Sequence, residues 1–314
     1  MSNNTKPSRR QFLGTAGLVG AGAVLASCAP SMAAPAKDNL DVAVLNFALN
    51  LEYLEAAFYL AAVGRLGELD GIGGNAEIIL PTGTNSPQKA FTTQARDGKG
   101  MTFASAAIKG YADEIAQDEI NHVLFLRKAL GAAAVNRPVL DIGPAFGNAA
   151  KAATGADAAL KFSPYDAGGP SDLYFLHGAF IFEDVGVTAY KGAARLLTDD
   201  SAGGVLDSAA GILAIEAYHA GQIRTILYAN KDADTGYGVD VKTLIGAISD
   251  LRGALGGGKD QGLVVGGKAN INPTDANSIA FSRSTREVLN IVYGAKDATK
   301  GLFYPNGLNG AITK

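Results

Sequence analysis

Two pairs of residues in the sequence combine a glutamate with a histidine three positions later: Glu119 with His122, and Glu216 with His219. Side chains three residues apart lie on the same face of a helix, so each carboxylate would lie beside its imidazole. The chain has only three histidines, and these pairs use two of them. Carboxylate-rich sites with one imidazole per metal suit iron or manganese. Both pairs are therefore candidate metal ligands.

Two further glutamates are each followed seven positions later by a tyrosine: Glu52 by Tyr59, and Glu183 by Tyr190. The sequence thus contains a repeat, in which a Glu-x6-Tyr segment precedes a Glu-x-x-His segment, and the repeat occurs twice. Glu55 lies one helical turn from Glu52 and could replace or supplement it as a ligand. We prefer Glu52 because its spacing to a tyrosine recurs in the second half of the repeat.

Four glutamates gathered in a protein interior would repel one another and lose their hydration. They would take up protons unless cations lay between them. Two divalent cations would balance the four negative charges, and neutral imidazoles would complete the coordination. Di-iron and di-manganese helical bundles use this donor set, with a glutamate from each of two helices and a Glu-x-x-His pair from each of two others. We therefore predict a site for two iron ions or, alternatively, two manganese ions. The predicted ligands are Glu52, Glu119, His122, Glu183, Glu216 and His219, with Glu119 or Glu183 as the bridge.

Three other side chains are candidates for supporting these ligands. Asp118 could accept the free ring N–H of a ligating histidine and fix its tautomer, or it could be a solvated acid on the flank of its helix. Tyr59 and Tyr190 could donate hydrogen bonds to ligating carboxylates or lie near the metals as redox-active or shielding groups. Alternatively, they are ordinary core tyrosines. The third histidine, His177, lies off the apolar stripe of its helix, and we interpret it as a surface residue.

Four stretches of the sequence have the pattern of amphipathic helices, with apolar residues three and four positions apart. Each stretch carries one of the four glutamates in the middle of its apolar face. The expected helices cover residues 39–63, 102–130, 171–197 and 206–229. The sequence therefore predicts a mainly α protein, with an antiparallel four-helix bundle over residues 34–230.

The connections between these helices differ in length. Residues 199–204 form a short Asp/Ser/Gly turn, so the third and fourth helices should be antiparallel neighbours. Residues 65–100 and 131–170 are long, and the second of them could be a crossover that places the second and third helices side by side. Residues 231–314 hold 14 glycines in 84 positions, which argues against another long core helix. They should form a C-terminal extension that packs on the bundle. Short helices are expected near residues 239–255 and 284–293.

The N-terminal residues 1–33 have the pattern of an export signal. They contain three basic residues and no acid, and the segment SRRQFL at 8–13 resembles a twin-arginine signal followed by a Gly/Ala-rich apolar stretch. Two cleavage sites compete. A lipobox would end at Cys28 and attach a lipid anchor there, whereas a small-x-small motif at 31–33 would release a soluble protein. We favour the lipobox slightly, because it gives the only cysteine a role. The prediction is export by the twin-arginine translocation machinery to the periplasm or outer surface of a bacterium.

Composition limits the remaining classes of function. The chain has 314 residues, enough for one large or two modest domains. Lys and Arg number 27 against 30 Asp and Glu, and a net charge of −3 argues against a nucleic-acid-binding protein. One cysteine excludes an intrachain disulfide. No apolar run after residue 35 is long enough to span a membrane, so no transmembrane segment is expected in the mature chain.

Several segments resemble the ferritin-like superfamily: NLEYLEAAFY at 50–59, DEINH at 118–122 and IEAYH at 215–219. The tail segments REVLNIVYG at 286–294 and FYPNGLNG at 303–310 resemble exported ferritin-like proteins related to the plant desiccation-related proteins. The resemblance implies a ferritin-like bundle with a non-haem dimetal centre, linked to oxidative or desiccation stress. The long 65–100 connection and the tail depart from ferritins, which argues against an iron-storage cage.

The leading hypothesis is a di-iron or dimanganese carboxylate protein that reacts with O2 or H2O2. Its role would be iron oxidation or peroxide removal in oxidative or desiccation stress. One alternative is manganese-catalase-like disproportionation of peroxide. Another is a non-enzymatic stress-protective protein in which the metals only hold the bundle together. Whether the protein forms an oligomer is left open by the sequence.

Overall fold

The computed structural model of the chain describes residues 37–81, 91–155, 162–166 and 170–314. The expected export signal of residues 1–33, with Cys28, lies outside these residues. In the parts of the chain that are described, no helix has both the length and the apolar character needed to cross a membrane.

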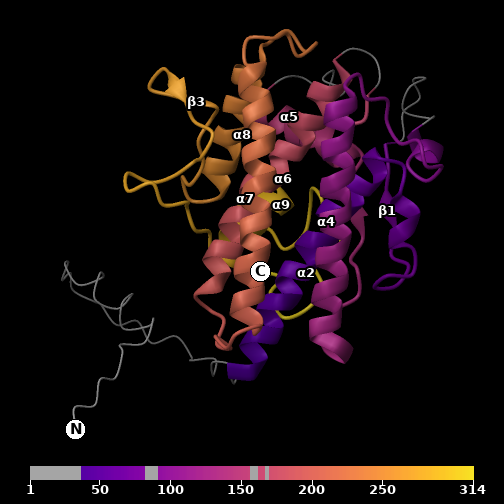
Figure 1. The fold of residues 1–314 in the computed structure, drawn as a ribbon, viewed down its shortest axis with the longest axis vertical. Coiled ribbons are helices and arrows are strands. Elements are labelled where there is room, and N and C mark those ends of the chain that lie inside the picture. The colour runs from indigo at the N-terminus through magenta and orange to yellow at the C-terminus, as the bar shows by residue number, and fades with distance from the viewer. Residues whose placement is uncertain (1–36, 82–90, 156–161, 167–169) are drawn as a thin grey trace. The chain divides into compact units, whose positions relative to one another are not determined.

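Four long helices form the bundle, and each carries one of the predicted glutamates (Figure 1). They are α2 (Lys37–Ala62), α4 (Ala106–Leu130), α6 (Ser171–Ala194) and α7 (Val205–Ala229). The second helix begins four residues later than the periodicity predicts, because Ser105 caps it by accepting a hydrogen bond from the Ile108 backbone N–H. Gly131, with a φ of 54°, follows its last residue. The mainly helical fold is confirmed.

The helices are arranged as two antiparallel hairpins. α2 packs along α4, α6 packs along α7, and the hairpins meet through α2 and α6. The third helix therefore lies against the first. The expectation that the 131–170 connection sets the second and third helices side by side is wrong, since that connection carries α6 across to α2.

The two long connections contain short elements. These are the 3-10 helices η1 (Leu66–Leu69) and η2 (Gly131–Ala133), the strands β1 (Ile78–Ile79) and β2 (Leu140–Asp141), and α5 (Pro144–Thr154). The two strands pair in parallel, with Ile78 opposite Leu140. α5 was not expected from the sequence, although Pro144 in its first turn and Gly155 with a φ of 64° just past its end are start and stop signals.

The C-terminal extension packs on the bundle through two helices. α8 (Val241–Leu255) contacts α5, α6 and α7, and α9 (Thr285–Tyr293) contacts α6 and α8. Both coincide with the short helices expected there. Asp240 caps α8, and a capping box of Ser284 and Glu287 begins α9. Between them, β3 (Val264–Val265) and β4 (Lys268–Ala269) form an antiparallel hairpin.

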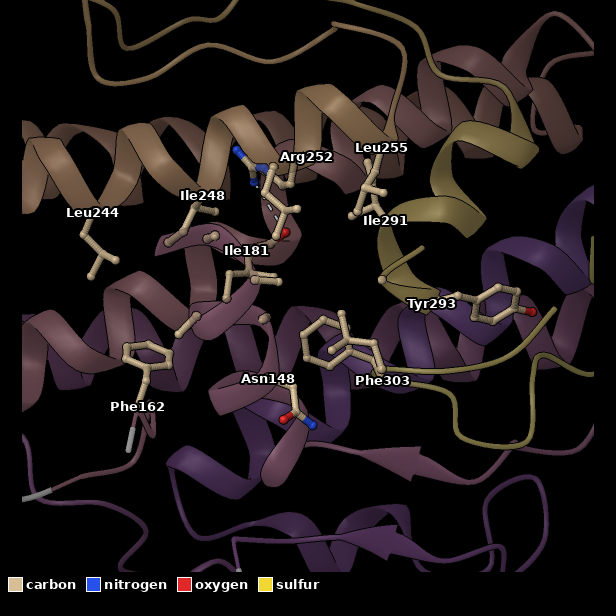
Figure 2. A pocket seen from close by; sticks show the side chains of 17 residues that line it. Asn148, Phe162, Ile181, Leu244, Ile248, Arg252, Leu255, Ile291, Tyr293 and Phe303 are labelled. Carbon is tan, nitrogen blue, oxygen red and sulfur yellow. Dashed lines mark hydrogen bonds between the residues drawn. The ribbon is translucent and has the colours of Figure 1, made fainter. Parts of the chain in front are cut away.

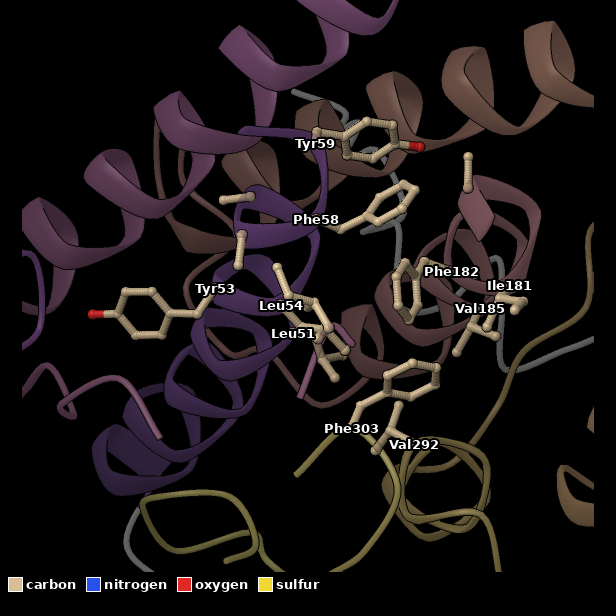
Figure 3. Packing of buried hydrophobic residues seen from close by; sticks show 14 of the residues in the cluster. Leu51, Tyr53, Leu54, Phe58, Tyr59, Ile181, Phe182, Val185, Val292 and Phe303 are labelled. Carbon is tan, nitrogen blue, oxygen red and sulfur yellow. The ribbon is translucent and has the colours of Figure 1, made fainter. Parts of the chain in front are cut away.

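A cluster of aromatic rings joins the bundle to the extension. Phe58 of α2 lies 5.4 Å from Phe146 of α5, and Phe303 of the tail lies 4.9 Å from Phe182 of α6 and 5.2 Å from Phe146. Figure 3 shows Phe303 beside α2 and α6 in this packing. Contacts of this kind stabilise a core beyond the area they bury. The tail therefore belongs to the same hydrophobic core as the helices that carry the predicted ligands.

Candidate metal centre

All six predicted ligands lie inside the bundle, with a seventh residue beside them. Their exposed fractions run from 0% for Glu52, Glu119 and Glu216 to 8% for His122. The seventh is Glu55, at 5%. Each of the four long helices contributes, because each predicted stripe faces the axis of the bundle. Glu55 was expected to replace or supplement Glu52, and the structure brings both carboxylates into one cluster with the other ligands.

The seven residues form three overlapping groups, and within each group one ligand atom per residue lies within 4.8 Å of the others. The first group is Glu52, Glu119, His122 and Glu216. The second is Glu119, Glu183 and His219, and the third is Glu55, Glu183 and Glu216. The first two contain one imidazole each and share Glu119. Glu119 is therefore placed to bridge two cations, as one of the two bridging candidates.

Both imidazoles turn Nδ1 toward the carboxylates. His122 Nδ1 lies 3.2 Å from Glu52 Oε2 and 3.7 Å from Glu119 Oε2. His219 Nδ1 lies 3.2 Å from Glu119 Oε1 and 3.5 Å from Glu183 Oε2. The two imidazoles thus approach opposite oxygens of Glu119, which is what a carboxylate shared between two cations requires.

Several of these buried atoms have no hydrogen-bond partner among the described residues. They are both carboxylate oxygens of Glu119 and of Glu216, Glu183 Oε2 and His219 Nδ1. Buried polar atoms are almost always hydrogen-bonded, because an unpaired one costs free energy. Oxygen and imidazole donors that converge without partners fit a pair of hard or borderline divalent cations. The donor set therefore fits the predicted dimetal site.

The pKa shifts in the cluster follow from burial and from its two histidines. Burial raises the pKa of Glu52 to about 7 and also raises the pKa of Glu55, Glu183 and Glu216. Burial acts in the same direction on Glu119, but the two imidazoles beside it favour its charged form and lower the pKa of that carboxyl well below its ordinary value.

The pKa values of both imidazoles are raised. Burial opposes the charged form of His122, but Glu52 and Glu119 raise its pKa to about 12. Burial also opposes protonation of His219, yet Glu183 and the other neighbouring carboxylates raise its pKa far above the ordinary value. A metal ion that binds here must displace these protons.

Two tyrosines connect the glutamates of α2 and α6. The Tyr59 hydroxyl on α2 donates a hydrogen bond to Glu183 Oε1 on α6, and the Tyr190 hydroxyl on α6 donates one to Glu52 Oε1 on α2. The Glu-x6-Tyr repeat therefore forms a reciprocal pair of hydrogen bonds between the hairpins. Each bond holds one oxygen of its carboxylate and leaves the other oxygen directed at the cluster.

Asp118 supports the second imidazole from the other side of its ring. Its Oδ2 lies 3.2 Å from His219 Nε2, while His219 Nδ1 faces Glu119 and Glu183. An acid in this position accepts the Nε2–H and so selects the tautomer whose Nδ1 lone pair is free to bind a cation. The Asp118 side chain is 36% exposed, so it also meets solvent.

His177 lies apart from this cluster, and its interpretation as a surface residue is wrong. It is fully buried in α6, and burial lowers its pKa to about 4, so the ring is neutral near pH 7. Most residues of α6 are buried, and the helix presents almost no solvent-facing stripe on which a histidine could lie. On a helix that is buried on almost every side, a position off the apolar stripe does not indicate exposure to solvent.

Behind the cluster lies a buried ionic network that the sequence analysis missed. Asp184 Oδ2 on α6 lies 2.8 Å from both Arg224 Nη1 on α7 and Arg252 Nη2 on α8. Asp260 bridges Arg252 and Arg283, with both distances 2.8 Å. These residues are far apart in the sequence and form no motif. The only signal is that Asp184 directly follows the predicted ligand Glu183.

A surface cavity of about 950 Å³ between α4 and α7 is lined in part by His219. Its polar lining includes Glu114, Asp118, Gln222 and Asn272. Since Asp118 and His219 line this cavity, it reaches the edge of the cluster.

The comparisons with known proteins agree with this geometry. A family model for the ferritin-like domain matches residues 40–229, which span all four bundle helices. A ferritin-like catalase of Nesocodon mauritianus is 27% identical over 303 residues, covering 92% of this chain and 90% of the relative. A desiccation-related protein of Craterostigma plantagineum is 30% identical over 284 residues, covering 85% and 83%. No solved structure gives a significant match. With its bundle, its buried glutamates and histidines and this match, the chain belongs to the ferritin-like domain family.

Proposed function

We propose that the cluster binds two iron or two manganese ions and that the loaded protein disproportionates hydrogen peroxide, 2 H2O2 → 2 H2O + O2. The observation that carries the proposal is the convergence of five carboxylates and two imidazoles with unpartnered donor atoms at the centre of the bundle. The similarity to a ferritin-like catalase over most of both chains supports peroxide as the substrate.

The chain's own residues would hold the ions and prepare the site. A pair of redox-active ions supplies the electron exchange that one peroxide molecule needs as oxidant and the next as reductant. Glu119 belongs to both histidine-containing groups, so it would hold the two ions close together. Asp118 keeps a proton on His219 Nε2, and the two tyrosines hold one oxygen each of Glu52 and Glu183.

Oxygen evolution from peroxide tests this function. Protein loaded with manganese, and separately with iron, is mixed with peroxide in an oxygen electrode, and its metal content is measured by elemental analysis. We expect two metal ions per chain and one O2 released for every two H2O2 consumed. Glu119→Gln should lose metal and activity, whereas Glu77→Gln, at an exposed position just before β1, should retain both. If the protein is fully loaded with each metal and neither form releases oxygen from peroxide, the proposal is refuted.

A second candidate function is the oxidation of ferrous iron by O2. The donor set of carboxylates and imidazoles is the one that di-iron bundles use, and Glu55 of the third group adds a further carboxylate beside it. In this case adding Fe²⁺ to the protein would consume O2, whereas peroxide disproportionation releases it. If neither reaction occurs and a chelator only lowers the melting temperature, the metals hold the bundle together and the protein is not an enzyme.

We also propose that the protein acts outside the cytoplasm, in the periplasm or on the outer surface of a bacterium. The twin arginines Arg9 and Arg10 and the apolar segment after them support export by the twin-arginine route. Replacing both with lysine keeps the charge, and we expect it to retain the protein in the cytoplasm on fractionation. Cys28→Ser should abolish incorporation of a labelled fatty acid without blocking export. Unchanged export of the twin-lysine variant would refute this route.

A further inference from the structure

Two apolar cavities lie in series between the protein surface and the candidate metal centre. The outer cavity has a volume of about 290 Å³ and lies between α5, α6, α8 and α9 (Figure 2). Its walls are mostly apolar, with Leu244 and Ile248 on α8 and Ile181 on α6, and Asn148 and Arg252 are the polar exceptions. Asn148 and Gly294 on its lining are exposed, so the cavity opens to solvent.

The inner cavity is much smaller, about 20 Å³, and lies between α2, α6 and α9. Figure 3 shows Leu51 and Leu54 of α2 facing Val185 of α6 across this region. The two cavities share three lining residues, Ile181, Ile291 and Phe303. The inner cavity therefore continues the outer one toward the bundle axis, with these three side chains as the boundary.

The inner cavity ends at the carboxylate cluster. Its lining includes Glu55, which shares a group with Glu183 and Glu216. Gly186 also lines it, and a Cβ atom at this position would lie 2.1 Å from Glu216 Oε2. The absence of a side chain at Gly186 thus leaves the cavity wall directly against a carboxylate of the centre.

Size and polarity together select what can pass. A cavity of about 20 Å³ holds a molecule about the size of one water. Its walls offer no hydrogen-bonding side chain except Glu55 at the inner end, so an ion or a polar molecule would lose hydration without compensation. An apolar diatomic molecule loses little and fits.

We propose that these cavities are the path by which dioxygen moves between the protein surface and the metal centre. The inference rests on the proposed function, in which O2 is the product. The polar reactant peroxide would use the cavity beside Asp118 and His219, which is bounded by α4 and α7. The centre would thus exchange a polar and an apolar molecule through separate routes, and Ile181, Ile291 and Phe303 would form the narrow part of the apolar one.

Dissolved oxygen itself is the probe for the test, because it is paramagnetic and speeds the relaxation of nearby methyl groups. Methyl-labelled full chain, metal-free and zinc-loaded, is compared under O2 and under argon. We expect a severalfold larger O2 effect at Ile181, Val185 and Leu54 than at Ile120 and Leu197, which are similarly buried but line neither cavity. A polar nitroxide should affect none of these five. Equal O2 effects at all five methyl-bearing residues would overturn the proposal.

Two variants locate the narrow part of the path. Ile181→Phe adds volume at the boundary, and Leu244→Phe makes a comparable addition in the outer cavity alone. We expect Val185 and Leu54 to lose the O2 effect in the first variant and to keep it in the second. If Val185 and Leu54 keep the O2 effect in both variants, Ile181 is not part of the path. The comparison of cavity and control methyl groups in the unmodified chain remains valid even if a variant does not fold.

The two proposals fail in different ways. If the chain is not a catalase, no oxygen is evolved from peroxide, but the methyl groups along the cavities still respond to dissolved O2. If the path is wrong, oxygen is evolved while these methyl groups respond no more than the buried controls.

Discussion

The hydroxyls of Tyr59 and Tyr190 each fix one oxygen of a carboxylate on the opposite hairpin. A carboxylate with one oxygen held in this way can rotate less, so its second oxygen stays directed at the cluster. For Glu183 that second oxygen has no other hydrogen-bond partner among the described residues, and for Glu52 it faces His122 Nδ1 at 3.2 Å. The tyrosines therefore prepare the ligands rather than bind the metals.

Removing either hydroxyl should weaken metal binding while the fold persists. For Tyr59→Phe and Tyr190→Phe we expect a loss of affinity of about 10–100-fold, the usual effect of removing a group that orients a metal ligand. Affinity is measured by competition with a chelator. Tyr165→Phe is the matched control, since Tyr165 is also buried but its hydroxyl contacts no ligand. Equal losses in all three variants would contradict the positioning role.

The raised pKa values predict that metal binding strengthens with pH. Below about pH 7 Glu52 holds a proton, because burial raises its pKa to about 7, and Glu55, Glu183 and Glu216 are shifted in the same direction. A metal ion must displace these protons, so affinity should rise by about tenfold per pH unit for each proton released. Titration between about pH 6 and 8 checks the slope. An affinity independent of pH would contradict the shifts.

At the scale of the elements, α6 connects two buried charge systems. Glu183 belongs to the metal cluster, and the next residue, Asp184, is held by Arg224 of α7 and Arg252 of α8. Successive residues of a helix point in directions about 100° apart, so the two carboxylates face different neighbours. The ion pairs of Asp184 thereby fix the rotation of α6 and, through it, the position of Glu183.

Asp184→Asn should destabilise the protein strongly. It would leave Arg224 and Arg252 buried beside a neutral amide, and breaking a buried ion pair costs about 3–5 kcal/mol. The free energy of unfolding is measured by chemical denaturation. Asp113→Asn, which breaks an exposed pair with Lys109 at 2.7 Å, should cost about 0–1 kcal/mol. Similar losses for both variants would show that the network does not act as a buried unit.

The sequence predicted the elements whose signals are local and periodic. Four amphipathic stripes located the long helices, and the spacing of Glu119 and His122 identified side chains that the structure brings together. The packing of α6 against α2 depends on the crossover between hairpins, which no local pattern specifies. The network of Asp184 and its arginines joins residues 40 to 68 positions apart. Such contacts arise only from the tertiary fold, so periodicity cannot reveal them.

At the scale of the whole molecule, the C-terminal extension completes the bundle. Its Tyr304 hydroxyl donates to the Asn50 carbonyl at 2.7 Å, and the Asn309 N–H donates to Asn50 Oδ1 at 3.0 Å. These bonds attach the tail to α2 at Asn50, two residues before the ligand Glu52. Phe303 lines both apolar cavities, α8 and α9 line the outer one, and α9 also lines the inner one. The extension is therefore part of the structure around the centre rather than a separate domain.

The buried carboxylates of the core predict that Glu216→Gln has opposite effects on the melting temperature in the metal-free and the metal-bound protein. Both oxygens of Glu216 lack hydrogen-bond partners among the described residues, and burial raises the pKa of this carboxyl well above its ordinary value. In the metal-free protein at neutral pH, the raised folded-state pKa makes this acid destabilising, and the cost grows as pH rises above its unfolded pKa. Glu216→Gln should therefore raise the melting temperature of the metal-free protein.

With metal bound, the same substitution should lower the melting temperature. The bound cations stabilise the folded protein by mass action, and loss of a ligand weakens that contribution. Melting is followed with and without two equivalents of metal. Glu114→Gln removes the same charge from the exposed face of α4, and it should leave both temperatures nearly unchanged. If Glu216→Gln raises both melting temperatures or lowers both, the prediction is contradicted, and Glu216 does not exchange a cost in the metal-free protein for a gain on metal binding.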